Sequence, residues 1–140
     1  MFAYPVILER DSDGSFVARF PDVPEAITFG ATKAEALEHA VDALETALSL
    51  YIDDSRPLPK VSTARGRATV APTLIGSLKL GLYQSMKQRN IRKTDLARRM
   101  GVALMQIDRL LDLTHHSRVD QLEAAYAALS IKVGLSLETA

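Results

Sequence analysis

The stretch TDLARRMGVALMQIDRLL, residues 94–111, decides the fold of the second half of the chain. Apolar residues recur at helical spacing on both sides of Gly101: Leu96, Ala97 and Met100 before it, and Ile107, Leu110 and Leu111 after it. Glycine supplies the permissive backbone that a tight turn needs, and the small Ala97 lets a second helix cross closely. The pattern predicts a helix-turn-helix, whose second helix can enter the major groove of DNA.

Basic residues surround this stretch, and only Asp95 and Asp108 oppose them. The basic set is Lys87, Arg89, Arg92, Lys93, Arg98, Arg99 and Arg109. One interpretation is a helical hairpin with an ordinary charged surface. The excess of positive charge favours the other interpretation, a DNA-binding unit.

The start of the predicted second helix would face the bases, with contacts from Ala103, Leu104, Met105, Gln106 and Arg109. Gln106 can contact adenine, Arg109 can reach guanine or a phosphate, and apolar side chains can touch thymine methyl groups. Leu104 and Met105 have an alternative role, which is packing against a partner. On the first helix we expect Thr94 to be the cap and, with Lys93, to suit a bound phosphate, and we add Arg98 as a further DNA contact.

The whole chain has 140 residues, a net charge of zero and no cysteine, which excludes disulfides, thiolate zinc sites and a cysteine nucleophile. Residues 1–70 hold seven Lys/Arg against eleven Asp/Glu, whereas residues 71–140 hold ten against six. An acidic half and a basic half indicate different partners, unless the charges are segregated by chance. No membrane-spanning run and no signal peptide is evident, so we expect a cytoplasmic protein without a membrane partner.

The first half predicts strands over residues 2–9, 15–20 and 26–29, with a hairpin turn at residues 10–14 and a rigid loop at 21–24. Thr32 and Glu35 form a capping box for an amphipathic helix that runs to about residue 52. A connector follows at residues 53–64, and residues 67–71 are expected to return a fourth strand to the sheet. The result is a β-β-β-α-β domain over residues 1–71.

The second half begins at Pro72 and predicts only helices. Apolar spacing indicates a helix of about four turns from Leu74, closed by Asn90, and another helix over residues 118–130 beyond the central pair. Residues 131–137 form either a terminal strand or a continuation of that helix. The expected fold class is therefore α+β: the domain of residues 1–71, then an all-α domain over residues 72–140 that resembles Cro and repressor-type domains.

Catalytic and metal chemistry has little support in the sequence. Asp11, Asp13 and Gly14 suggest a calcium loop, but glycine is at the fourth position and not at the sixth. His115 and His116 are adjacent in a predicted loop, a spacing that metal ligands seldom use. Asp11, Asp13 and Asp22 near strand ends leave a metal-dependent nuclease as a minor alternative. We expect no enzymatic activity, no metal and no cofactor.

The phrase ARFPDVPEAITFGATKAEALEHAVDAL, residues 18–44, closely resembles the HicB family, the antitoxins of HicAB toxin–antitoxin systems. The matching elements are Phe20-Pro21-Asp22, Pro24, the ITFG strand and the Glu-Ala-Leu step into the helix. One branch of that family appends a helix-turn-helix, so the resemblance covers almost the whole chain. Glu25 departs from a frequent glycine, Ala103 from a frequent capping Ser or Thr, and Leu104 from a frequent glutamine.

The resemblance implies a partly degenerate RNase H-like first domain that binds HicA, a small basic toxin that cleaves mRNA. We assign toxin contacts to Phe20, Asp22 and Glu25. It also implies that the second domain dimerises and binds the operator of its own operon; family members often pair further into tetramers. The expected function is that of an antitoxin and autoregulatory repressor. The alternative is a stand-alone transcriptional regulator whose α+β domain senses a ligand.

Overall fold

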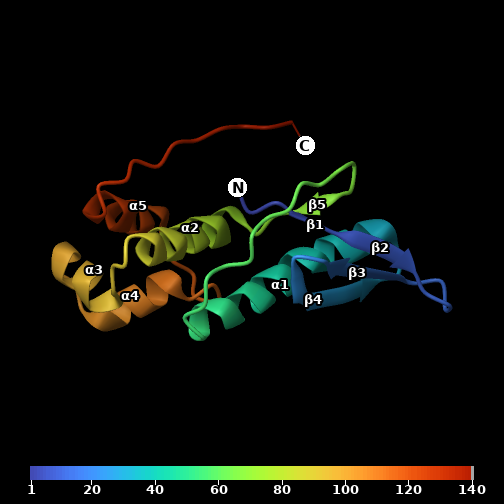
Figure 1. Cartoon of the computed structure of the whole chain (residues 1–140), viewed down its shortest axis with the longest axis horizontal. Coiled ribbons are helices and arrows are strands. Elements are labelled where there is room, and N and C mark those ends of the chain that lie inside the picture. Colours follow the sequence, from blue (N-terminus) through green and yellow to red (C-terminus); the bar gives the residue numbers. More distant parts are fainter. Residues whose placement is uncertain (140) are drawn as a thin grey trace. The chain divides into compact units, whose positions relative to one another are not determined.

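The computed structural model describes residues 1–139 and divides into two compact units, Met1–Ser77 and Leu78–Ala140. Figure 1 shows strands in the first unit and helices through the second. The division lies inside helix α2 (Leu74–Gln88), whereas the expected domain boundary at residues 71 and 72 precedes that helix. The α+β class expected from the sequence is confirmed.

The first unit contains a three-stranded antiparallel sheet in the order β2-β3-β4, with β2 at Ile7–Arg10, β3 at Phe16–Phe20 and β4 at Val23–Gly30. A tight turn joins β2 to β3: the Gly14 N–H donates to the Asp11 carbonyl at 3.0 Å. Gly14 has a φ of +88°, which favours glycine. The Asp-rich segment is therefore the predicted hairpin turn.

Three strand predictions were wrong, two in their bounds and one in its pairing. The third strand begins at Val23, so the loop predicted at residues 21–24 is partly strand; β4 is an edge strand, where Pro24 is tolerated. The strand expected over residues 2–9 is divided into β1 (Tyr4–Pro5) and β2. β1 pairs with β5 (Thr69–Val70) in a separate two-stranded sheet, so β5 does not join the three-stranded sheet as predicted.

Helix α1 (Lys33–Asp53) packs on one face of the three-stranded sheet. The Glu35 N–H donates to Thr32 Oγ1 at 3.1 Å, which confirms Thr32 as the cap. The buried face of α1 is rich in small residues: Ala36, Ala40, Leu44, Ala47 and Leu48. Contact with β4 is so close that a Cβ on Gly30 would lie 2.3 Å from the Ala36 nitrogen.

The second unit packs α3 (Lys93–Met100), α4 (Leu104–Leu111) and α5 (Val119–Ala128) with the C-terminal part of α2. Its core consists of fully buried aliphatic side chains, namely Leu80, Leu82, Leu96, Ile107, Leu122 and Leu129. Gly101 ends α3 with a φ of +67°, the left-handed conformation that the predicted turn requires.

The cap of α3 is not the one predicted. The helix begins at Lys93, and Thr94 lies within its first turn. The Arg92 N–H donates to Asp95 Oδ2 at 3.0 Å, so a carboxylate from the first turn satisfies the amide that precedes the helix. Thr94 is the second residue of the helix and is therefore not at the capping position, whereas the side chain of the third residue, Asp95, can reach back to the Arg92 amide.

The last segment adopts neither of the two structures predicted for it. Helix α5 ends at Ala128, and residues 131–139 form no helix and no strand. Ser130 takes a left-handed φ of +59°, and its N–H donates to the Ala127 carbonyl at 2.9 Å. The Ile131 N–H donates to the Tyr126 carbonyl at 2.9 Å, which completes a Schellman end to the helix.

Candidate functional site

Helix α4 presents the beginning of its sequence to solvent. Ile107, Leu110 and Leu111 are buried and anchor the helix in the second unit. All five predicted base contacts, Ala103 just before the helix and Leu104, Met105, Gln106 and Arg109 within it, are exposed. Leu104 is 45% and Met105 61% exposed, so neither side chain is part of the core of this unit. The structure thus leaves all five residues accessible at and around the start of α4.

The predicted basic contacts on α3 are also exposed, and nearby carboxylates pair with them. Lys93 Nζ lies 2.8 Å from Asp108 Oδ1, and Arg98 Nη1 lies 3.7 Å from Asp95 Oδ1. Exposed ion pairs of this kind contribute little stability, so both basic groups can exchange a carboxylate for a phosphate at low cost. The hydrogen bond from the Arg92 N–H lowers the pKa of Asp95, which keeps this carboxylate charged.

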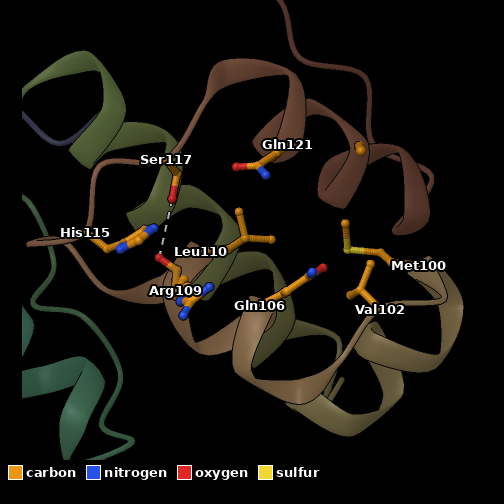
Figure 2. A pocket seen from close by; sticks show the side chains of 9 residues that line it. Met100, Val102, Gln106, Arg109, Leu110, His115, Ser117 and Gln121 are labelled. Carbon is orange, nitrogen blue, oxygen red and sulfur yellow. Dashed lines mark hydrogen bonds between the residues drawn. The ribbon is translucent and has the colours of Figure 1, made fainter.

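A pocket of about 350 Å³ lies between the end of α3, helix α4 and helix α5 (Figure 2). Gln106 and Arg109 both line it, and Gln121 contributes from α5. Arg109 Nη2 lies 3.4 Å from Met105 Sδ, one turn back along α4. Gln106 and Arg109, the two polar residues predicted to contact bases, therefore border open space. Their side chains can reorient without disturbing the core.

Lys79 holds the C-terminal end of α4 in place, a role that the sequence analysis did not predict. It is fully buried in α2, and its ammonium group donates to the carbonyls of Arg109, Asp112 and His115 at 2.9, 2.7 and 2.6 Å. A cation at a helix C-terminus satisfies carbonyls that have no partner inside the helix. Burial lowers the pKa of Lys79, and the Asp112 carboxylate acts in the opposite direction. The only available signal was a lysine between the apolar residues Leu78 and Leu80.

The three predicted toxin contacts differ in their surroundings. Phe20 is only 1% exposed and belongs to the core of the first unit. Asp22 accepts hydrogen bonds from the N–H and hydroxyl of Ser62, at 2.8 and 2.6 Å. Glu25 accepts from the Tyr51 hydroxyl at 2.8 Å. Asp22 therefore holds the chain that follows α1, and Glu25 the last turn of α1, near the start of β4. A partner on this surface would meet these two carboxylates before Phe20.

A groove between β4 and α1 is an acidic concave surface of the first unit. Its walls carry Glu25, Glu38 and Asp42, and no Lys or Arg is among its described lining residues. Two large apolar side chains beside these carboxylates are exposed: Ile27 is 57% and Leu50 48% exposed. The groove, named here the acidic groove, follows the free edge of the sheet, because β4 is the last strand. Such a surface suits a basic protein with apolar anchors.

Comparison with known proteins identifies the family. Residues 3–80 match the family described as the HicB-like antitoxin of bacterial toxin–antitoxin systems. An Antitoxin HicB from Pseudomonas fluorescens (strain Pf0-1) is 36% identical over the whole of this chain and 97% of its own length. An Antitoxin HicB from Escherichia coli (strain K12) is 37% identical over 94% of this chain and 96% of its own length. This chain belongs to the HicB-like antitoxin family.

The match to the HicB-like family contains the acidic groove and the Asp22 and Glu25 carboxylates, since it covers the first unit and the start of α2. Antitoxin HicB 2 from Photorhabdus laumondii, 39% identical, covers 90% of this chain, so its alignment also extends into the helices of the second unit. The resemblance to HicB antitoxins that the sequence indicated is confirmed.

Among residues 1–139, no helix combines the length and apolar character needed to cross a bilayer. In the same part of the chain, no three His, Asp or Glu side chains gather closely enough to hold a metal ion.

Proposed function

We propose that this HicB-like antitoxin neutralises a HicA-type, mRNA-cleaving toxin with residues 1–71 and represses its own operon by DNA binding through residues 72–140. One observation carries the proposal: the two units offer accessible surfaces of opposite charge, the acidic groove in the first and the basic α3–α4 surface in the second. The role is regulatory, in keeping with the antitoxin family, and we propose no catalysis by this chain.

Toxin binding is assigned to the acidic groove, which includes Glu25, and to the nearby carboxylate of Asp22. Phe20, expected from the sequence to contact the toxin, is buried and supports this surface from within the core. The HicB resemblance implies a small basic toxin, and carboxylates around an apolar strand edge complement such a partner in charge and in chemistry. The assignment treats β4 and α1 as part of an RNase H-like domain that has become a binding module.

DNA binding is assigned to α3 and α4 as a helix-turn-helix. The left-handed Gly101 gives the turn, and α4 exposes Leu104, Met105 and Gln106 at its start, with Arg109 one turn on. Lys93, Thr94 and Arg98 are exposed on α3, and to them we assign the phosphate contacts that would fix the position of the protein on DNA. Base contacts from one glutamine and one arginine are few, so phosphate contacts and two copies on a symmetric operator would carry much of the affinity.

The test is co-expression with the small open reading frame adjacent to this gene. We expect the neighbour to arrest growth when expressed alone, this chain to relieve the arrest, and the two proteins to co-purify. Arrest that persists in the presence of this chain would refute the antitoxin half. The repressor half is tested separately, by binding of the full-length protein to the promoter DNA of the operon and to a scrambled duplex in the same salt.

A further inference from the structure

The segment that follows α5 has the pattern of a strand that lacks its partner. Residues 131–138 read IKVGLSLE, in which every second residue is apolar: Ile131, Val133, Leu135 and Leu137. Apolar residues at every second position are typical of a β-strand with one buried face. In the structure this face is not buried, since Val133 is 42%, Leu135 79% and Leu137 87% exposed. Within the described part of the second unit there is no strand with which the segment could pair.

The end of α5 directs this segment into an extended path. The Ser130 and Ile131 hydrogen bonds close the last turn, and the left-handed φ of Ser130 turns the backbone out of the helix. The chain then continues as an extended trace after α5 (Figure 1). Continuation as a helix is thus prevented at Ser130, and the apolar face of the segment has no partner within the described second unit.

We propose that this partner is the same segment of a second copy, paired antiparallel about a twofold axis at Leu135. Leu135 then faces Leu135 of the second copy, and Val133 faces Leu137. On the other face of the ribbon, Lys132 lies opposite Glu138, and by symmetry this ion pair forms twice. Cross-strand pairs of apolar side chains and of opposite charges are the arrangement that stabilises antiparallel strands.

The charges select this register among the alternatives. A slip of one residue would place apolar side chains opposite polar ones and turn the two apolar faces in opposite directions. A slip of two residues would retain the apolar face but separate Lys132 from Glu138. The segment is therefore complementary to itself in one register, which is what a twofold interface requires. A two-stranded ribbon is marginal in isolation, so we expect its apolar face to rest on helices of the two second units.

The paired segments of the two copies, called here the ribbon, rest on the proposed function and add a mode of dimerisation to it. A twofold dimer would present two α4 helices to a symmetric operator. The two ideas can nevertheless fail separately, since self-association is measured without DNA and without toxin.

Cysteine cross-linking of the full-length protein tests the register, and the absence of native cysteine makes each introduced thiol unique. Leu135→Cys should form an intermolecular disulfide, because the residue faces itself. Val133→Cys alone should not, since the two copies of residue 133 would lie about 14 Å apart along the ribbon, beyond the reach of a disulfide. An equimolar mixture of Val133→Cys and Leu137→Cys should cross-link again. Equal cross-linking of Val133→Cys and Leu135→Cys would overturn the register.

Light scattering combined with size-exclusion chromatography tests the ribbon without thiols. We expect the wild-type chain to be a dimer or a larger even assembly, and Leu135→Lys to dissociate at least about tenfold more readily, because it places two lysines directly opposite each other. Ser136→Lys, one residue away on the polar face, is the matched control and should associate as the wild type does. A monomeric wild type, or association of Leu135→Lys equal to that of Ser136→Lys, would overturn the proposal.

A charge exchange gives an independent measurement. Lys132→Glu and Glu138→Lys should each associate more weakly than the wild type, since each places like charges opposite one another. Mixed together, the two variants should form heterodimers in which both ion pairs are restored. If mixing leaves each variant as weakly associated as before, the pairing of Lys132 with Glu138 is refuted.

Discussion

Lys79 holds α4 and its exposed residues in place, although its own side chain is not part of that exposed surface. Its ammonium group is completely buried and donates to three carbonyls at the end of α4 and in the loop that follows. Among the described buried side-chain nitrogen and oxygen atoms, every one has a hydrogen-bond partner. Removal of this group would leave the Asp112 and His115 carbonyls without their donor.

Lys79→Met should therefore destabilise the second unit by about 1–3 kcal/mol, the range for a buried polar group that loses its partner. Methionine matches the length of the lysine stem but cannot donate. Lys87→Met, at an exposed position on the same helix, is the control and should change the free energy of unfolding by less than about 0.5 kcal/mol. Urea unfolding of both variants provides the measurement; equal stability of the two would show that the three hydrogen bonds contribute nothing.

Gln106 and Arg109 are the residues on which the proposed base readout depends. Gln106→Ala and Arg109→Ala should each weaken binding to the operator by about 1–3 kcal/mol, while neutralisation of the toxin remains intact. Matched controls are Gln88→Ala and Arg65→Ala, which remove the same side chains at exposed positions outside α4. A fluorescence-anisotropy titration measures the effect. Loss of both operator binding and toxin neutralisation would show that the two activities are not separable.

At the scale of the element, α3 depends on a carboxylate at its start. The bond from the Arg92 N–H lowers the pKa of Asp95. A carboxyl group whose pKa is lower in the folded state contributes stability above its unfolded pKa, and this contribution is lost as the pH falls through the folded value. The cap of α3 is therefore expected to weaken in acid.

The variant Asp95→Ala should lower the urea midpoint at neutral pH, and its difference from the wild type should shrink as the solution is acidified. Thr94→Ala is the matched control, because it changes the neighbouring residue that the sequence had suggested as the cap. We expect Thr94→Ala to have the smaller effect at neutral pH. A difference between wild type and Asp95→Ala that stays constant from neutral to acid pH would contradict the role assigned to the carboxylate.

At the scale of the whole molecule, the acidic and basic halves of the sequence become two compact units with surfaces of opposite charge. If the acidic groove binds a basic toxin, reversal of its charge must affect the toxin and leave the operator unaffected. The double variant Glu38→Lys, Asp42→Lys should weaken toxin binding by about tenfold or more through repulsion. Binding of promoter DNA by the same preparation should match the wild type.

The control for this prediction is Asp11→Lys, Asp53→Lys, which changes the net charge equally but lies outside the acidic groove. Isothermal titration with the purified toxin compares the two double variants. If both weaken toxin binding equally, net charge and not the groove determines the affinity. If neither does, the toxin binds elsewhere on this chain.

The sequence by itself determined the elements that have a strong local cause. Thr32 caps α1 by accepting from the backbone N–H of Glu35, Gly101 ends α3, and the apolar spacing around Gly101 gives two short helices. The phrase that first indicated the family was equally local, since residues 18–44 run continuously from β3 into α1. Each of these features depends on residues a few positions apart, which a sequence displays directly.

Only the tertiary structure decided the features that join distant residues. It paired β5 with β1 and not with the three-stranded sheet, buried Lys79 against carbonyls more than 30 residues away, and tied Asp22 to Ser62. It also showed that the apolar alternation of residues 131–138 is without a partner in the described chain. Strand pairing and burial depend on which surfaces meet in space. Periodicity along the chain predicts that an element has an apolar face, but not which other element covers that face.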